Sequence, residues 1–126
     1  MPTATRFPIQ FDAPYARLSR ALFIPPSDSY VEIADNEVSV RMGWAFRAKF
    51  DRSRVTRASL SGKRIPLTRG VHGWAGRWLV NGAGDGIVAI DLDPTQRARV
   101  MGFPVRLRQL LVSVEDPSAL AGALAS

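Results

Sequence analysis

The stretch YVEIADNEVSVRMGWAFRAKFDR, residues 30–52, alternates apolar and polar side chains with a period of two. This period is typical of β-strands, whose successive side chains point to opposite faces of a sheet. Two such runs, residues 30–34 and 37–42, flank Asp35-Asn36, a dipeptide that suits a tight turn. The sequence therefore predicts a hairpin here, and a further strand directly after it.

The second half of this stretch divides its side chains between two faces. One set is apolar and is expected to be buried, namely Trp44, Phe46, Ala48 and Phe50. The other set is polar and is expected to face solvent, namely Arg47, Lys49 and Asp51. Aromatic and cationic residues on one face would favour base stacking on a nucleic acid, but here they fall on opposite faces.

A glycine-rich segment, GRWLVNGAGDGIVAIDL at residues 76–92, has the composition of a phosphate-binding loop. Dinucleotide loops need glycines spaced Gly-x-Gly-x-x-Gly before a helix, whereas Gly82, Gly84 and Gly86 precede an alternating β-branched run. We therefore expect a hairpin whose two arms are residues 76–81 and 87–92. Residues 62–73 are expected to form a loop, and DLDP at residues 91–94 the end of a strand.

Each end of the chain carries a helix signal. Asp12 can cap a helix that has Pro14 in its first turn, and Tyr15, Leu18 and Leu22 follow at helical spacing after an extended start. At the other end, Asp116 and Pro117 repeat this signal before an apolar stripe formed by Leu120 and Leu124.

Together, these patterns predict a mainly β protein with about seven short strands. We expect a small antiparallel, orthogonal sandwich or partly open barrel, with a short N-terminal helix and a C-terminal helix covering one end. The 126 residues suit a single domain, with residues 1–29 as an N-terminal addition and residues 30–125 as the β body with its final helix.

The hairpin VEIADNEVSVRMGW and the closing LLVSVEDPSALAGAL resemble bacterial pleckstrin-homology-like domains. The segments GRWLVNGAGDGIVAIDL and VMGFPVRLRQLLVSVEDP are also similar to a group of small actinobacterial proteins. The resemblance covers about residues 30–125 and implies a fold but no activity. Pleckstrin-homology domains that bind phosphoinositides carry basic residues in the first hairpin loop. Here that loop is the acidic ADNE, so phosphoinositide binding is not carried over, and Arg41 is the nearest cation.

The amino-acid composition excludes several classes of function. The chain has no cysteine and one histidine, which excludes a disulfide framework, a thiol nucleophile and a zinc site of the usual ligand set. Its start does not read as a signal peptide, and no apolar run approaches the roughly 18 residues of a transmembrane helix. We therefore expect a cytoplasmic protein without a metal or cofactor.

The charge is strongly positive and unevenly spread. The net charge is +6, with an acidic segment at residues 28–37, a basic one at residues 41–69 and a second basic cluster at Arg97, Arg99, Arg106 and Arg108. Such a surface favours contact with a polyanion or an acidic protein, although a compositional bias toward Arg is the simpler explanation of the excess. The candidate anion- or partner-binding residues are Arg41, Arg47, Lys49, Arg52, Arg54 and Arg57.

Two other groups of residues are weaker candidates for a functional site. Trp44, Trp74 and Trp78 are candidates for lining a ligand cavity, Trp74 and Trp78 as a plug of the barrel. His72, Asp91 and Asp93 are the only plausible acid–base groups, and no nucleophile motif accompanies them. We therefore expect a non-enzymatic binding module that uses a basic face, with a small-molecule or lipid-binding barrel as the alternative.

Overall fold

The computed structural model describes residues 4–61 and 69–125, with Trp74 described by its backbone alone. In this part of the chain nine strands form one mixed sheet, and two α-helices accompany it. The helices are α1 (Ala13–Ala21) and α2 (Pro117–Ala125), and short 3-10 turns are η1 (Pro26–Asp28) and η2 (Arg52–Arg54). None of the described helices is long and apolar enough to cross a membrane.

The first layer holds β1 (Ala4–Pro8), β2 (Ser29–Ala34), β3 (Glu37–Met42) and β4 (Phe46–Asp51). These four strands pair in chain order, all antiparallel. Side chains alternate between buried and outward along β2, β3 and β4, as the period of two predicts. Pro8 lies in β1 at the edge of the sheet, where its missing N–H costs no ladder bond.

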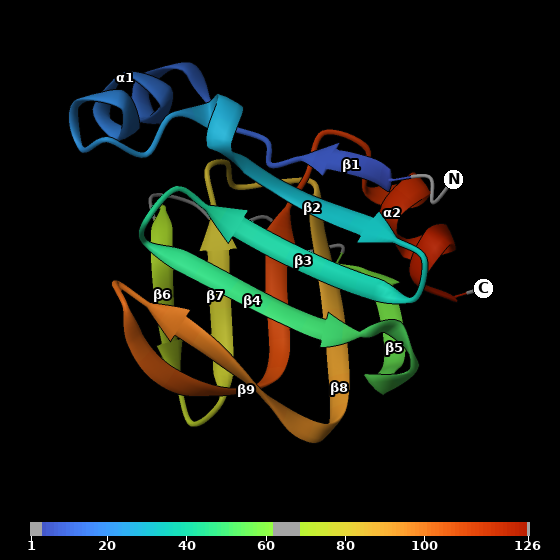
Figure 1. Cartoon of the computed structure of the whole chain (residues 1–126). Coiled ribbons are helices and arrows are strands. Elements are labelled where there is room, and N and C mark those ends of the chain that lie inside the picture. Colours follow the sequence, from blue (N-terminus) through green and yellow to red (C-terminus); the bar gives the residue numbers. More distant parts are fainter. Residues whose placement is uncertain (1–3, 62–68, 126) are drawn as a thin grey trace.

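The second layer holds β5 (Val55–Leu60), β6 (Gly70–Trp74), β7 (Arg77–Asn81), β8 (Ile87–Val100) and β9 (Phe103–Ser113). The long strand β8 joins the layers, because its first half pairs with β5 and its last residues pair with β4. Its register against β9 shifts between Asp91 and Gln96, where it changes neighbour. Figure 1 shows β2, β3 and β4 crossing in front of β6, β7 and β8, so that the sheet folds over its own core. Within the described residues the sheet does not close, because β1 and β6 remain at its two ends.

The core lies between the layers. Phe46, Val31 and Leu110 are fully buried there, and Leu120 and Leu124 of α2 add to the same cluster. The Asp116 side chain accepts from the Ala119 N–H at 3.2 Å, which confirms the predicted cap of α2. The mainly β sandwich with a terminal helix is therefore confirmed in outline.

The predicted hairpin of residues 76–92 is wrong. β7 does not pair with β8, because β9 lies between them, parallel to β7 and antiparallel to β8. The sheet is therefore mixed rather than antiparallel. The tight turn in this region instead connects β6 to β7 through Ala75-Gly76, both with positive φ. The predicted loop is wrong from Gly70 onward, and residues 62–68 lie outside the described residues.

The glycines of residues 82–86 allow close approach of the N-terminal segment. A Cβ on Gly82 would lie 2.6 Å from Phe11 Cγ, and one on Gly86 would lie 2.6 Å from the Val114 carbonyl oxygen. The Asp12 N–H donates to the Gly82 carbonyl at 2.9 Å. Phe11 and Val114 therefore occupy the space beside these glycines, and residues 81–84 are buried.

Three smaller expectations also need correction. Helix α1 is capped by Asp12 as predicted, but Leu18 and Leu22 are exposed, and the buried residue of the helix is Ser19. The segment DLDP does not end a strand, because β8 continues through it to Val100. The described residues form nine strands instead of about seven, and one of them, β6, begins at Gly70 where a loop was expected.

Candidate basic groove

The outward faces of β2, β3, β4 and the second half of β8 form one continuous surface. Strand pairing aligns their solvent-facing residues in rows that run across the sheet. In one row each residue is the direct cross-strand partner of the next, in the order Tyr30, Arg41, Arg47, Arg99 and Pro104. A second row begins with Glu32, Ser39 and Lys49.

The first row places three guanidinium side chains on three adjacent strands. Directly opposed residues on one face have Cβ atoms about 4.5–5.5 Å apart, and like charges there are destabilising. Arg47 lies between Arg41 on one side and Arg99 on the other. The fold therefore holds three like charges together at a cost in stability.

These rows line a groove of about 560 Å³. Its cations, which define the basic groove below, are Arg41, Arg47, Lys49, Arg97 and Arg99. Tyr30, Glu32, Ser39 and Pro104 complete its polar and aromatic walls. The volume is within the range of roughly 300–1,000 Å³ that is usual for small-ligand sites.

Carboxylates balance only one side of the groove. Asp28 Oδ1 lies 3.0 Å from Arg41 Nε, and Glu37 Oε1 lies 3.4 Å from Lys49 Nζ. Within the described residues, no carboxylate lies within ion-pair distance of Arg47 or Arg99. Arg99 donates from Nη1 to the Gly102 carbonyl at 3.2 Å, which orients its side chain without neutralising it.

At the β2 end, Arg6 covers the tyrosine of the groove. Its Cζ lies 4.1 Å from the centre of the Tyr30 ring, and its Nε lies 3.5 Å from Glu32 Oε2. The positive charge of Arg6 is therefore already engaged by Tyr30 and Glu32. The uncompensated positive charge is therefore concentrated at the β4–β8 junction.

The six predicted anion-binding residues separate into two groups. Arg41, Arg47 and Lys49 line the basic groove. Arg52 and Arg54 lie in η2, and Arg57 lies in β5 opposite Asp91. None of these last three is among the residues that line the groove.

The turn at η2 has its own local electrostatics. Asp51 accepts from the Ser53 N–H at 2.9 Å. Hydrogen bonds from the Ser53 backbone and side chain, with a smaller contribution from the charge of Arg54, lower the pKa of Asp51. The carboxylate caps this turn and reduces its positive charge.

The predicted tryptophan cavity is not assembled from the two tryptophans whose side chains are described. Trp44 does not face the core with Phe46, because the turn at Gly43 (φ +52°) directs it outward, where it is 47% exposed. Trp78 is half-buried on β7, and its Nε1 donates to the Arg106 carbonyl at 3.1 Å. The Trp74 side chain lies outside the described part of the structure, so its place in the predicted plug is not described.

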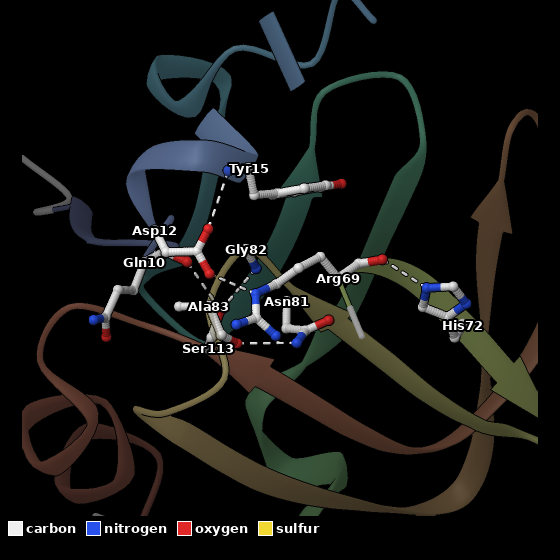
Figure 2. A network of polar contacts seen from close by, with 9 residues as sticks. All are labelled: Gln10, Asp12, Tyr15, Arg69, His72, Asn81, Gly82, Ala83 and Ser113. Atoms are coloured by element: carbon white, nitrogen blue, oxygen red, sulfur yellow. Dashed lines mark hydrogen bonds and ion pairs between the residues drawn. The ribbon is translucent and has the colours of Figure 1, made fainter. Parts of the chain in front are cut away.

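Figure 2 shows a polar network between the N-terminal segment and the second layer. The Asp12 carboxylate accepts from the Tyr15 N–H at 3.1 Å and from Arg69 Nε at 2.6 Å. Burial alone would raise the pKa of Asp12, but these hydrogen bonds and the charge of Arg69 outweigh it and lower the pKa. Burial, with the charge of Asp12, raises the pKa of Tyr15. The network fastens α1 to the sheet.

The candidate acid–base residues do not form one site. His72 is exposed on β6, and its Nε2 lies 2.6 Å from the Arg69 carbonyl oxygen. Asp91 accepts from Gln109 Nε2 at 2.8 Å, and Asp93 is exposed further along β8. Three strand spacings, roughly 14 Å, separate β6 from β8 across the sheet. No group of three or more potential metal ligands occurs among the described residues.

Arg97 and Arg99 form a basic cluster in the sequence, but the sequence alone does not place them beside Arg41, Arg47 and Lys49. Their contribution depends on the change of neighbour along β8, which pairs Arg99 with Arg47. The available signal was the alternation of Arg97, Ala98 and Arg99, which marks both arginines as outward on a strand. No local pattern in the sequence indicates that this part of β8 pairs with β4.

Comparisons with known proteins found no counterpart. No family model matches the chain, and neither the curated proteins nor the solved structures contain a match to it.

Proposed function

We propose that the protein is a non-enzymatic binding module that holds a phosphate-bearing anionic partner in the basic groove. The observation that carries this proposal is the cross-strand row of Arg41, Arg47 and Arg99, of which only Arg41 is paired with a carboxylate of the described part of the chain. A fold gains no stability from three opposed cations, so a bound anion is the simplest reason for their arrangement.

The side chains of the groove suit phosphate better than an isolated carboxylate. Guanidinium groups present planar forks that bind phosphate oxygens in pairs. Five cations line one concave surface, and four of them lie on the adjacent strands β4 and β8, namely Arg47, Lys49, Arg97 and Arg99. A partner with several phosphate charges can contact these groups at the same time. Binding rather than catalysis is favoured because the groove lining contains no histidine and a single carboxylate, Glu32.

The relation to pleckstrin-homology-like domains is part of this proposal. The β sandwich and the final helix beginning at Pro117 support it, whereas the parallel pairing of β7 with β9 departs from an antiparallel sandwich. The proposed site is the outward face of the first layer and not the acidic turn at residues 34–37. We also propose a cytoplasmic location, which the absence of cysteine supports.

The test is calorimetric titration of the protein with inorganic tripolyphosphate at low and high salt. We expect binding that weakens with salt, because exposed charges are screened. Replacing Arg47 and Arg99 together by Gln should weaken binding at least about tenfold, since each charge-assisted hydrogen bond contributes roughly 1.5–3 kcal/mol.

The matched control is the double variant R54Q/R57Q, which removes the same charge outside the groove. Its affinity should remain within about twofold of the unmodified protein, since distant exposed charges interact weakly. Equal losses in the two double variants would mean that net charge alone drives binding, and no binding at low salt would refute the proposal.

A further inference from the structure

Large apolar side chains are exposed on one side of the molecule. The described residues include seven large exposed hydrophobic side chains, and six of them lie in or directly after α1, in the β3–β4 turn or at the β8–β9 turn. We call this group the apolar end, and it consists of Leu18, Leu22, Phe23, Trp44, Met101 and Phe103. Leu60 on β5 is the seventh and lies elsewhere.

Hydrogen bonds join the segments that carry the apolar end. Trp44 Nε1 donates to the Leu22 carbonyl at 2.8 Å, and the Met101 N–H donates to the Ala45 carbonyl at 2.9 Å. Figure 1 shows α1, the β3–β4 turn and the β8–β9 turn on the same side of the molecule. The segments that carry these exposed side chains therefore lie on one side of the molecule.

Two residues of this surface adopt a backbone conformation that large side chains rarely take. Phe23 has φ +61° and Met101 has φ +50°, in the left-handed region that favours Gly or Asn. Phe23 is 82% exposed and Met101 is 55% exposed, so burial in the core does not compensate for this strain. At Met101 the two-residue turn between Val100 and Phe103 requires the positive φ, but neither site requires a large apolar side chain.

The apolar end adjoins the basic groove. Trp44 and Met101 line a depression of about 340 Å³ together with Arg47, Arg99 and Gly102. Arg47 and Arg99 also line the groove, so the same two cations border both surfaces. Apolar side chains and uncompensated cations therefore face outward within one continuous area.

We propose that this area docks the protein on an anionic lipid bilayer, with the apolar end in the interfacial region and the basic groove against lipid phosphates. A bilayer presents phosphates directly beside apolar chains, which matches this arrangement of side chains, and Trp is favoured at that interface. Each cation near such a surface contributes about fivefold in affinity. The inference rests on the proposed function, because it assigns the phosphates of the groove to lipids.

Charge and exposure favour a bilayer over other partners. A second copy of the chain would bring two basic grooves together, with like charges opposed. A nucleic acid would pair with the cations and stack bases on exposed aromatic rings, but it offers no apolar phase for Leu18, Leu22 and Met101. The turn at residues 34–37 takes no part, because Glu37 and Asp35 make it acidic.

The experiment is sedimentation of the full chain with vesicles of phosphatidylcholine, with and without 30% phosphatidylglycerol, beside titration with tripolyphosphate. We expect binding to the anionic vesicles only. The double variant M101S/F103S should lose at least about tenfold in vesicle affinity and keep its affinity for tripolyphosphate. L60S, which removes an exposed leucine elsewhere, should bind vesicles as the unmodified protein does. If M101S/F103S does not fold, F23S tests the same surface from α1.

Each other outcome overturns the proposal. Tripolyphosphate binding without vesicle binding leaves the proposed function intact but assigns the groove to a soluble ligand. A single-stranded oligonucleotide that binds while vesicles do not points to a nucleic acid, and self-association that M101S/F103S abolishes points to a second copy. If M101S/F103S binds vesicles as the unmodified protein does, the apolar end takes no part in docking. If the protein binds neither tripolyphosphate nor vesicles, both the proposed function and this inference are refuted.

Discussion

The loop at residues 82–86 and the turn at Met101-Gly102 both depend on glycine, but they use it in opposite ways. In the loop, the N-terminal segment occupies the space where side chains would project, and residues 81–84 are buried. At the turn, a Cβ on Gly102 would meet nothing within 4 Å, and the neighbouring Met101 and Phe103 are exposed. The loop contributes to stability, whereas the turn presents side chains to the surroundings.

Replacing Gly82 by Ala should give the largest change in stability. Its new Cβ would lie 2.6 Å from Phe11 Cγ and 2.7 Å from the Gln10 carbonyl oxygen, so the N-terminal segment must shift. We expect this overpacking to lower the free energy of unfolding by about 3 kcal/mol. Urea unfolding measures this change. The control is G102A, which should cost about 1 kcal/mol from its positive φ alone. Equal costs for the two variants would remove the distinction between the two regions.

The second prediction concerns the network that holds α1 beside this loop. D12A removes both the helix cap and the ion pair with Arg69 and should cost about 1–2 kcal/mol at pH 7. The pKa of Asp12 is lowered in the folded state, so its stabilisation is complete above the unfolded value of 3.8. It is lost as the pH falls through the folded pKa. Unfolding curves at pH 7 and pH 3 should therefore show a smaller difference between D12A and the unmodified protein at the lower pH.

The third prediction is a small effect at the turn. M101S/F103S should change the free energy of unfolding by less than about 0.5 kcal/mol, because both side chains are mostly exposed. Urea unfolding at pH 7 measures this directly. A loss of 2 kcal/mol or more would show that the turn belongs to the core, which contradicts the contrast with the loop.

Local patterns in the sequence predicted the parts of the fold that depend on neighbouring residues. The alternation in residues 30–51 located β2, β3 and β4 and most of their buried side chains, and Asp116-Pro117 located α2. The exception was Trp44, because the positive φ of Gly43 interrupts the alternation. The resemblance to pleckstrin-homology-like domains stays a prediction.

Contacts between distant segments were not predictable in this way. The glycines at residues 82–86 indicated a hairpin, but their neighbours are Phe11 and Val114, and β9 separates the two arms. Only part of the candidate site was predictable, because the rest depends on contacts between distant segments. Arg41, Arg47 and Lys49 follow from alternation, whereas Arg97 and Arg99 join them only because β8 leaves β5 and pairs with β4.

Thermal unfolding of R47Q/R99Q, with and without tripolyphosphate, tests the central claim that Arg47 and Arg99 bind an anion rather than stabilise the fold. Without ligand, the variant should unfold at the same temperature as the unmodified protein or slightly above it, because removing opposed like charges gains about 0.2–1 kcal/mol. A ligand at a hundredfold excess over Kd stabilises the folded state by about 2.7 kcal/mol, and the variant should lose most of this gain. A variant that unfolds earlier without ligand, yet gains as much from tripolyphosphate, would contradict the account.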